Sequence, residues 1–162
     1  MKKLITLFIT ISLLSCNDGD FDVPEFEFSE TIKTCGEYII YRTNTENTEV
    51  IILNLSPSNL GTVEGDKDVN LSSSVTIHYR IFDDAISDNY FCQNIPPATP
   101  ILLKELIAES GTLHIKTTAI KSSTEEITGY KYSITISDLL FNDIKERIFF
   151  ESFDFGELEI NL

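Results

Sequence analysis

The chain has few cations: of its 162 residues 12 are Lys or Arg and 26 are Asp or Glu, which gives a formal net charge of −14. Proteins that bind nucleic acid use cations to replace phosphate counterions, so this charge argues against a nucleic-acid partner. The chain also lacks tryptophan and has only two histidines and three cysteines. Few residues are therefore left for histidine-based catalysis or for a zinc site.

The first 15 residues have the parts of a secretory signal peptide. Lys2 and Lys3 precede an apolar run from Leu4 to Leu14, and the small Ser15 follows it. An apolar run of this length is too short for a membrane-spanning helix, which needs about 20 residues. We therefore interpret residues 1–15 as a signal that is removed.

The end of this run, Leu13-Leu14-Ser15-Cys16, resembles a bacterial lipobox. The resemblance implies that Cys16 receives a diacylglycerol, that the signal is cut before it, and that the new N-terminus is acylated. More than one acyl chain would make the membrane attachment stable. The alternative is an ordinary signal peptide followed by a chance cysteine.

An acidic segment follows the cysteine, with aspartates at positions 18, 20 and 22. It resembles the export signal of surface lipoproteins in the Bacteroidota, which implies that Asp18, Asp20 and Asp22 direct the protein to the outer membrane or cell surface. The alternatives are a hydrated tether and a calcium loop, since Asp-x-Asp spacing supplies oxygen ligands. We expect residues 16–24 to form a tether and residues 25–162 a single domain, a plan that resembles small lipoproteins of the Bacteroidota.

The remaining chain alternates apolar and polar residues with a period of two, which is typical of half-buried strands. The alternation predicts inward side chains at Leu113, Ile115, Tyr130, Tyr132, Ile134, Ile136, Val75, Ile77, Tyr79, Ile81, Leu158, Ile160 and Leu162. Tyr38–Tyr41 and Val50–Leu53 are apolar on both faces, which suits central strands covered on both sides. We predict an all-β fold, an antiparallel β-sandwich of eight or nine strands, with immunoglobulin-like topology as one form of it.

Three segments are harder to interpret. Residues 101–108 contain helix formers, but we favour a strand that turns at Ser110-Gly111 and pairs with Leu113–Ala119; a short helix is the alternative. Residues 56–74 and 83–100 are rich in turn-forming residues and are expected to be long loops. Within the first loop, Glu64–Asp68 is a weak candidate for a cation site, since Gly65 would allow three carboxylates to converge.

No catalytic, metal-binding or cofactor-binding residues are predicted. His78 and His114 fall on the polar faces of their strands, and no nucleophile and acid are expected beside either ring. The neighbouring pairs Asp83-Asp84 and Glu125-Glu126 do not suit a carboxylate mechanism, because adjacent strand residues face opposite ways. We interpret these acids as solvated.

Two predictions concern the loop at residues 83–100. If Cys16 carries lipid, Cys35 and Cys92 remain in an exported, oxidising setting and are expected to form a disulfide. The alternative is two separately buried thiols. Tyr90 and Phe91 stand beside a proline-rich stretch and are candidates for a binding loop, although burial as core residues over the end of the sandwich is the favoured interpretation.

These observations favour a membrane-anchored lipoprotein that is not an enzyme and that binds a protein or a glycan or takes part in an envelope assembly. An extracellular hydrolase that acts on polymers through carboxylates is the first alternative, and it would require two carboxyls in one cleft. A purely structural module is the second alternative.

Overall fold

The computed structural model of this chain describes residues 27–29, 31–93, 95–143 and 147–162. The predicted signal peptide, the lipidation site Cys16 and the export signal Asp18, Asp20 and Asp22 lie outside the described residues. The described elements are β1 (Lys33–Cys35), β2 (Ile39–Thr43), β3 (Glu49–Asn54), β4 (Gly65–Asn70), β5 (Thr76–Phe82), the 3-10 turn η1 (Tyr90–Cys92), β6 (Leu102–Lys121), β7 (Ile127–Asn142) and β8 (Arg147–Asn161). None of the helical segments in this part of the chain is long and apolar enough to cross a membrane.

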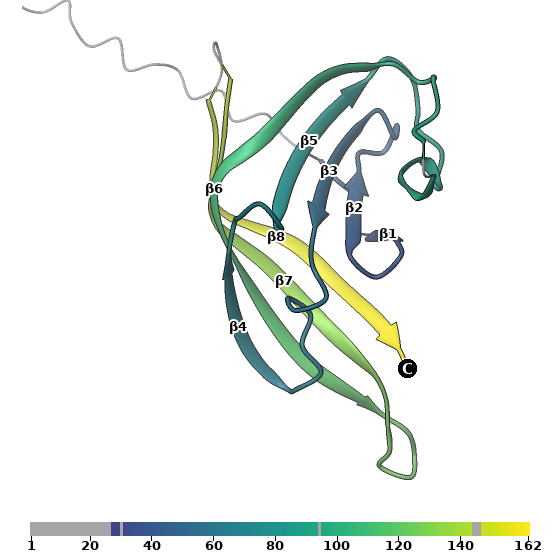
Figure 1. Ribbon diagram of the computed structural model, residues 1–162, viewed down its shortest axis with the longest axis vertical. Helices are drawn as coiled ribbons and strands as arrows, with labels where there is room; N and C mark the ends of the chain where they lie inside the picture. The colour runs from purple at the N-terminus through teal and green to yellow at the C-terminus, as the bar shows by residue number, and fades with distance from the viewer. Residues whose placement is uncertain (1–26, 30, 94, 144–146) are drawn as a thin grey trace, which may run out of the picture.

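The eight strands form one antiparallel sheet in the order β1-β2-β3-β5-β6-β7-β8, and β4 also pairs with β6. The sheet curls into a half-barrel, with β6 running along its bend (Figure 1). The first part of β6 pairs with β5, and the second part pairs with β4 on one edge and with β7 on the other. The predicted all-β, antiparallel fold is confirmed. The two separate sheets of a sandwich are not, because β6 is continuous through both halves.

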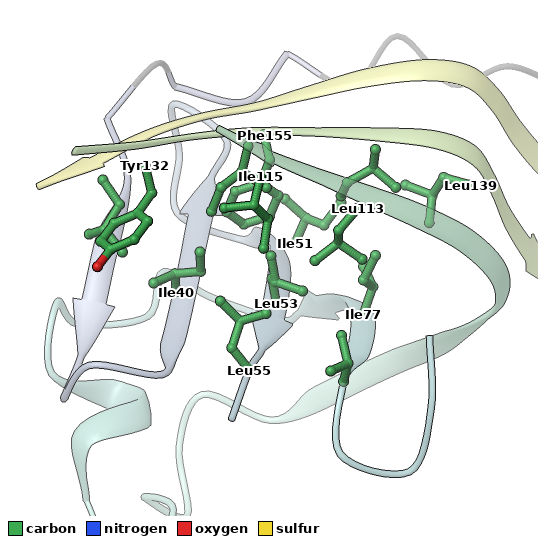
Figure 2. Packing of buried hydrophobic residues seen from close by; sticks show 14 of the residues in the cluster. Ile40, Ile51, Leu53, Leu55, Ile77, Leu113, Ile115, Tyr132, Leu139 and Phe155 are labelled. Carbon is green, nitrogen blue, oxygen red and sulfur yellow. The ribbon is translucent and has the colours of Figure 1, made fainter. Parts of the chain in front are cut away.

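The concave face of the half-barrel holds the main core. Ile51, Tyr79 and Leu106 are neighbours in the register of β3, β5 and β6, and their side chains pack against residues from the opposite half. Figure 2 shows Phe155 and Ile115 of that half pointing toward Ile51 of β3. Burial of this apolar surface is the main force that keeps the sheet curled.

Most of the predicted inward positions are confirmed. The buried ones are Leu113, Ile115, Tyr130, Tyr132, Ile134, Ile136, Val75, Ile77, Tyr79 and Leu158. Leu162 is exposed, and Ile81 and Ile160 are only partly buried. At Ile81 the register between β5 and β6 shifts, and the next residue, Phe82, is buried instead.

The strand predicted for residues 101–108 is confirmed for 102–108, but the predicted hairpin at Ser110-Gly111 is wrong. The chain continues through these residues as β6, with register irregularities between Ala108 and Thr112 where the sheet bends. A Cβ atom at Gly111 would lie 3.4 Å from Cγ2 of Ile136. Glycine therefore makes room for the core at a bend and does not close a turn.

The loop predicted for residues 56–74 contains β4, which sequence reasoning missed. Residues 65–70 pair with Thr112–Thr117 of β6 along the sheet edge, and most of their side chains are exposed. An edge strand with so little burial lacks the apolar alternation from which a strand is predicted. The tight turn expected at Gly65 to bring the carboxylates of the candidate cation site Glu64–Asp68 together is wrong, because Gly65 begins an extended strand and Glu64 Oε1 instead accepts a hydrogen bond from the Ala119 amide. In the described part of the chain no group of three or more His, Cys, Asp or Glu residues could hold a metal ion.

The two strands expected to be covered on both sides are confirmed as central. Beyond the main core, the outer faces of β2 and β3 carry a second apolar cluster made of Tyr41, Val50, Ile52, Phe82, Ile86 and Tyr90. Ile86 and Tyr90 belong to the segment 83–100, whose described residues fold back over these strands and include no strand. The segment thus acts as a cover for the outer face.

The cover is tied to the sheet by the predicted disulfide between Cys35 of β1 and Cys92 of η1, which is confirmed. The two Cα atoms are 5.0 Å apart, within the range for a bridge, and the sequence separation is 57 residues. Lys33 adds an ion pair to Asp88, with Nζ 2.7 Å from Oδ1. The cover is therefore attached at two places on one strand.

We expect the double variant Cys35→Ala/Cys92→Ala to unfold more easily than the wild type. The chain-entropy model gives a loss of about 4 kcal/mol in the free energy of unfolding for a loop of this length. Urea denaturation in the absence and presence of a reductant measures the difference. Reductant should shift the urea midpoint of the wild type to that of the variant and leave the midpoint of the variant unchanged. A wild type whose midpoint does not change with reductant and which has two modifiable thiols would contradict the bridge.

Candidate functional site

A concave, mostly apolar surface lies beside the cover, on the outer face of β5 and the start of β6. It is a pocket of about 500 Å³ between this face and the residues that follow η1. The lining residues are mostly aromatic, aliphatic or proline: Arg80, Phe82, Tyr90, Phe91, Gln93, Pro96, Pro97, Ala98, Pro100, Ile101 and Leu102. We call it the cover pocket.

Tyr90 and Phe91 take different parts in its walls. The Tyr90 ring is buried, with centroids 5.1 Å from those of Phe82 and Phe91. Phe91 is only partly buried and packs edge-on against Tyr41 at 4.9 Å. The favoured interpretation, a core role, is therefore confirmed for Tyr90, whereas Phe91 both supports the cover and presents a ring to the pocket.

Tyr41 of β2 binds the cover through a hydrogen bond. Its hydroxyl donates a hydrogen bond of 2.6 Å to the backbone carbonyl of Asp88. Burial, with a smaller contribution from the charge of Asp88, raises the pKa of Tyr41, so the phenol stays protonated and remains a donor. The position of the pocket wall thus depends on β2 as well as on the disulfide.

One charged cluster borders the cover pocket. Arg80 Nε lies 2.7 Å from Glu105 Oε1, and the same oxygen is 2.9 Å from His78 Nδ1. The guanidinium group of Arg80 also lies over the Phe91 ring, 5.9 Å from its centroid. Partial burial raises the pKa of Glu105, but the hydrogen bonds and charges of Arg80 and His78 outweigh it, and the net pKa is lowered. The only charged side chain among the described lining residues is therefore already paired.

The acids considered in the sequence serve local structure. Asp83 Oδ1 accepts a hydrogen bond of 2.6 Å from the Ile101 amide, and Asp84 Oδ1 accepts one of 2.7 Å from the Ala85 amide. Glu125 pairs with Lys121 in the β6–β7 connection. None of these three supplies a carboxylate to the cover pocket.

A group of glutamates that the sequence did not reveal lines a separate, polar hollow of about 480 Å³ around Glu27, Glu46 and Glu49. Several carboxylates thus border one hollow, as the hydrolase alternative requires, and Asp83 and Asp84 border another. Glu49 is engaged in the first of these, because its Oε2 accepts a hydrogen bond of 2.7 Å from the Tyr79 hydroxyl. No period or motif in the sequence signals this grouping, since it depends on how the turn before β3 folds.

Both histidines lie on outer faces, as expected, but the expectation that no acid and nucleophile lie beside them is wrong for His114. Its Nδ1 is 2.7 Å from Asp68 Oδ1 and its Nε2 is 3.0 Å from Ser137 Oγ. His78 has a related arrangement with Glu105 and, at 3.1 Å from Nε2, with Thr76 Oγ1. The sequence missed the His114 cluster because Asp68 was placed in a loop.

Comparison of the chain with models of protein families, with curated proteins and with solved structures finds no match. The function is therefore inferred from the geometry of these sites.

We expect the Arg80–Glu105–His78 cluster to give the protein a pH-dependent stability. Because the folded pKa of Glu105 lies below its ordinary value of 4.5, its contribution is complete above about pH 4.5 and is lost as the pH falls through the folded pKa. At pH 7, Glu105→Gln should lower the free energy of unfolding by about 1 kcal/mol, a modest value because the pair is partly exposed. The difference from the wild type should shrink in urea titrations below pH 4.5.

The exposed Glu151 of β8 offers a matched control for this charge removal. Glu151→Gln should change the free energy of unfolding by less than about 0.5 kcal/mol at pH 7. A Glu105→Gln variant as stable as the wild type at pH 7, or equally destabilised at every pH, would contradict the role of this cluster.

Proposed function

We propose that the protein is an envelope lipoprotein, anchored through Cys16 at the outer membrane or cell surface, whose cover pocket binds an apolar segment of a partner protein. The anchor and its location rest on the lipobox resemblance and on Asp18, Asp20 and Asp22. The binding role rests on one observation, the apolar pocket of about 500 Å³ beside a disulfide-anchored cover.

Exposed apolar side chains around the pocket support a protein ligand. Ile101 is 56% exposed and Leu102 41%, and Ile95, just before the prolines that line the pocket, is 81% exposed. Such side chains cost solubility unless a partner covers them, and apolar or aromatic residues set in a pocket are typical anchors of protein interfaces. A purely structural module would not need them.

The polar groups of the pocket favour a protein segment over a glycan. Sugar binding uses exposed aromatic faces together with several hydrogen-bonding side chains, but Tyr90 is buried and Arg80 is paired with Glu105. Gln93 is the remaining polar side chain in the described lining. A ligand with aliphatic side chains and few hydrogen-bonding groups fits this surface best, and binding requires no catalytic group.

To test the binding role, a photoreactive amino acid is placed at position 101, in the pocket wall, and the anchored protein is irradiated in intact cells. We expect a specific crosslinked protein. The same amino acid at position 127 is the control, because Ile127 is similarly exposed, at 46%, but lies at the start of β7.

In the same cells, Ile101→Glu should weaken co-purification of the crosslinked protein at least tenfold, since a buried charge without a partner opposes binding. Ile127→Glu should leave it unchanged. Equal crosslinking from both positions, or equal co-purification with both variants, would contradict a role for the cover pocket.

The anchor is tested by Cys16→Ala, which removes the thiol that would carry the lipid. We expect the variant to leave the membrane fraction or to keep its signal peptide, while the wild type stays in the membrane and is cut by protease added to intact cells. Fractionation and immunoblotting measure both outcomes. A Cys16→Ala protein of mature size that remains in the membrane would refute lipidation at this residue.

A further inference from the structure

A second constellation lies on the other half of the sheet, outside the cover pocket. We propose that Ser137, His114 and Asp68 form a nucleophilic serine site in which Ser137 is acylated by neutral carboxylic esters. The proposal goes beyond the binding function and does not depend on it. It also revises the expectation that no histidine-centred chemistry occurs in this chain.

The register of three strands places the constellation. Asp68 of β4 lies directly opposite His114 of β6, and Ser137 of β7 lies opposite Thr112, two residues before His114. His114 therefore reaches Asp68 across one strand pair and Ser137 diagonally across the other. All three side chains project from the polar outer face, so the contacts follow from sheet geometry.

The hydrogen bonds fix the direction of proton transfer. An ionised carboxylate only accepts hydrogen bonds, so Nδ1 of His114 donates its proton to Asp68, at 2.7 Å. In a neutral imidazole the other nitrogen then carries a lone pair, and Nε2 accepts the hydroxyl proton of Ser137, at 3.0 Å. This is the order of acid, base and nucleophile that activates a serine.

A hollow beside His114 provides room for a substrate. It measures about 390 Å³ and is lined by residues of β4, β6 and β7, among them Lys116, Ser133 and Thr135. Ser137 is not itself one of the lining residues; the hollow is lined on β7 by Thr135, two residues before Ser137, and it therefore lies next to the nucleophile along the strand. Lys116 adds a cation to the wall of the hollow, opposite Ser133 in the register, which lies four residues along β7 from Ser137.

The chain's negative charge sets the substrate class. A net charge of −14 opposes the approach of anions, and Asp66 and Asp68 line the same hollow, so a neutral ester is favoured. About 390 Å³ holds a short acyl group and not a polymer.

The proposed reaction balances without a cofactor. Ser137 Oγ forms a bond to the ester carbonyl carbon, its proton passes to His114 Nε2, and the bond to the leaving alcohol breaks as His114 returns the proton to the alcohol oxygen. Water then adds to the acyl carbon by the same route in reverse, releasing the carboxylic acid and restoring the Ser137 hydroxyl.

The His78 arrangement in the other half is a built-in comparison. Its acid, Glu105, is shared with Arg80, and its hydroxyl, on Thr76, already accepts a hydrogen bond of 3.0 Å from Asn54. We expect the His78, Glu105 and Thr76 side chains to stabilise the fold and Thr76 not to react with esters.

The test uses an uncharged alkyl fluorophosphonate, which loses fluoride when a serine oxygen attacks its phosphorus. We expect the full folded protein to be labelled at Ser137, as shown by mass spectrometry of the peptide that contains it, and Ser137→Ala to lose that label. His114→Gln should slow labelling about 100-fold or more, the size of a general-base effect. In the variants Thr76→Ala and His78→Gln, the reagent should label Ser137 at the wild-type rate.

The variant Asp68→Asn provides a second test of the site in case the His114→Gln variant does not fold. Asp68 is 72% exposed, so its replacement disturbs the fold little, but it removes the group that fixes the imidazole and should slow labelling about tenfold or more. Release of p-nitrophenolate from p-nitrophenyl acetate gives a second measurement, lost in Ser137→Ala. The proposal would be overturned if Ser137 of the folded wild type were labelled no faster than in urea-unfolded protein. It would also be overturned if the folded variants Asp68→Asn and His114→Gln were labelled as fast as the wild type.

Discussion

Strands β2 and β3 are apolar on both faces, and the rest of the structure follows from the need to remove both faces from water. Ile40, Ile51 and Leu53 point inward and are covered by the opposite half of the curled sheet. Tyr41, Val50 and Ile52 point outward, and the cover from residues 83–100 packs on them. The first requirement bends β6; the second holds the proline-rich segment against the sheet and creates the cover pocket beside it.

Alternation carried most of the information that the sequence offered about the fold. Where a strand buries one face, as around Leu113–Ile115 and Tyr130–Ile136, the period of two was visible and the burial is as expected. The disulfide followed from cysteine counting and the expected compartment. Neither argument depends on how distant strands pair, which is why both were possible without a structure.

The missed features all depend on pairing or on local departures from regular geometry. Residues 65–70 bury almost nothing, so nothing in their sequence distinguishes an edge strand from a loop. Ser110-Gly111 suits a turn by composition, but here the chain bends without reversing. Predicting the Ser137–His114–Asp68 cluster requires knowing both that residues 65–70 form a strand and that β6 continues through Ser110-Gly111. Asp68 contacts His114 only because residues 65–70 pair with the second part of this unbroken strand.

The irregularities in β6 decide what each outer face can do. Leu106 points inward, so a strictly alternating strand would send residues 108, 110, 112 and 114 inward as well and would turn Leu113 to solvent. Leu113 is instead fully buried, and His114 reaches Asp68 on the outer face. The register breaks between Ala108 and Thr112 make this change of phase. In β7 the change comes at Asp138, which has a positive φ of 52°, and Leu139 is buried just after it. Ser137 thus stands on the outer face immediately before its strand changes phase, beside a histidine that the bend of β6 has brought outward. The bend that closes the core is therefore also what assembles the polar cluster on its reverse side.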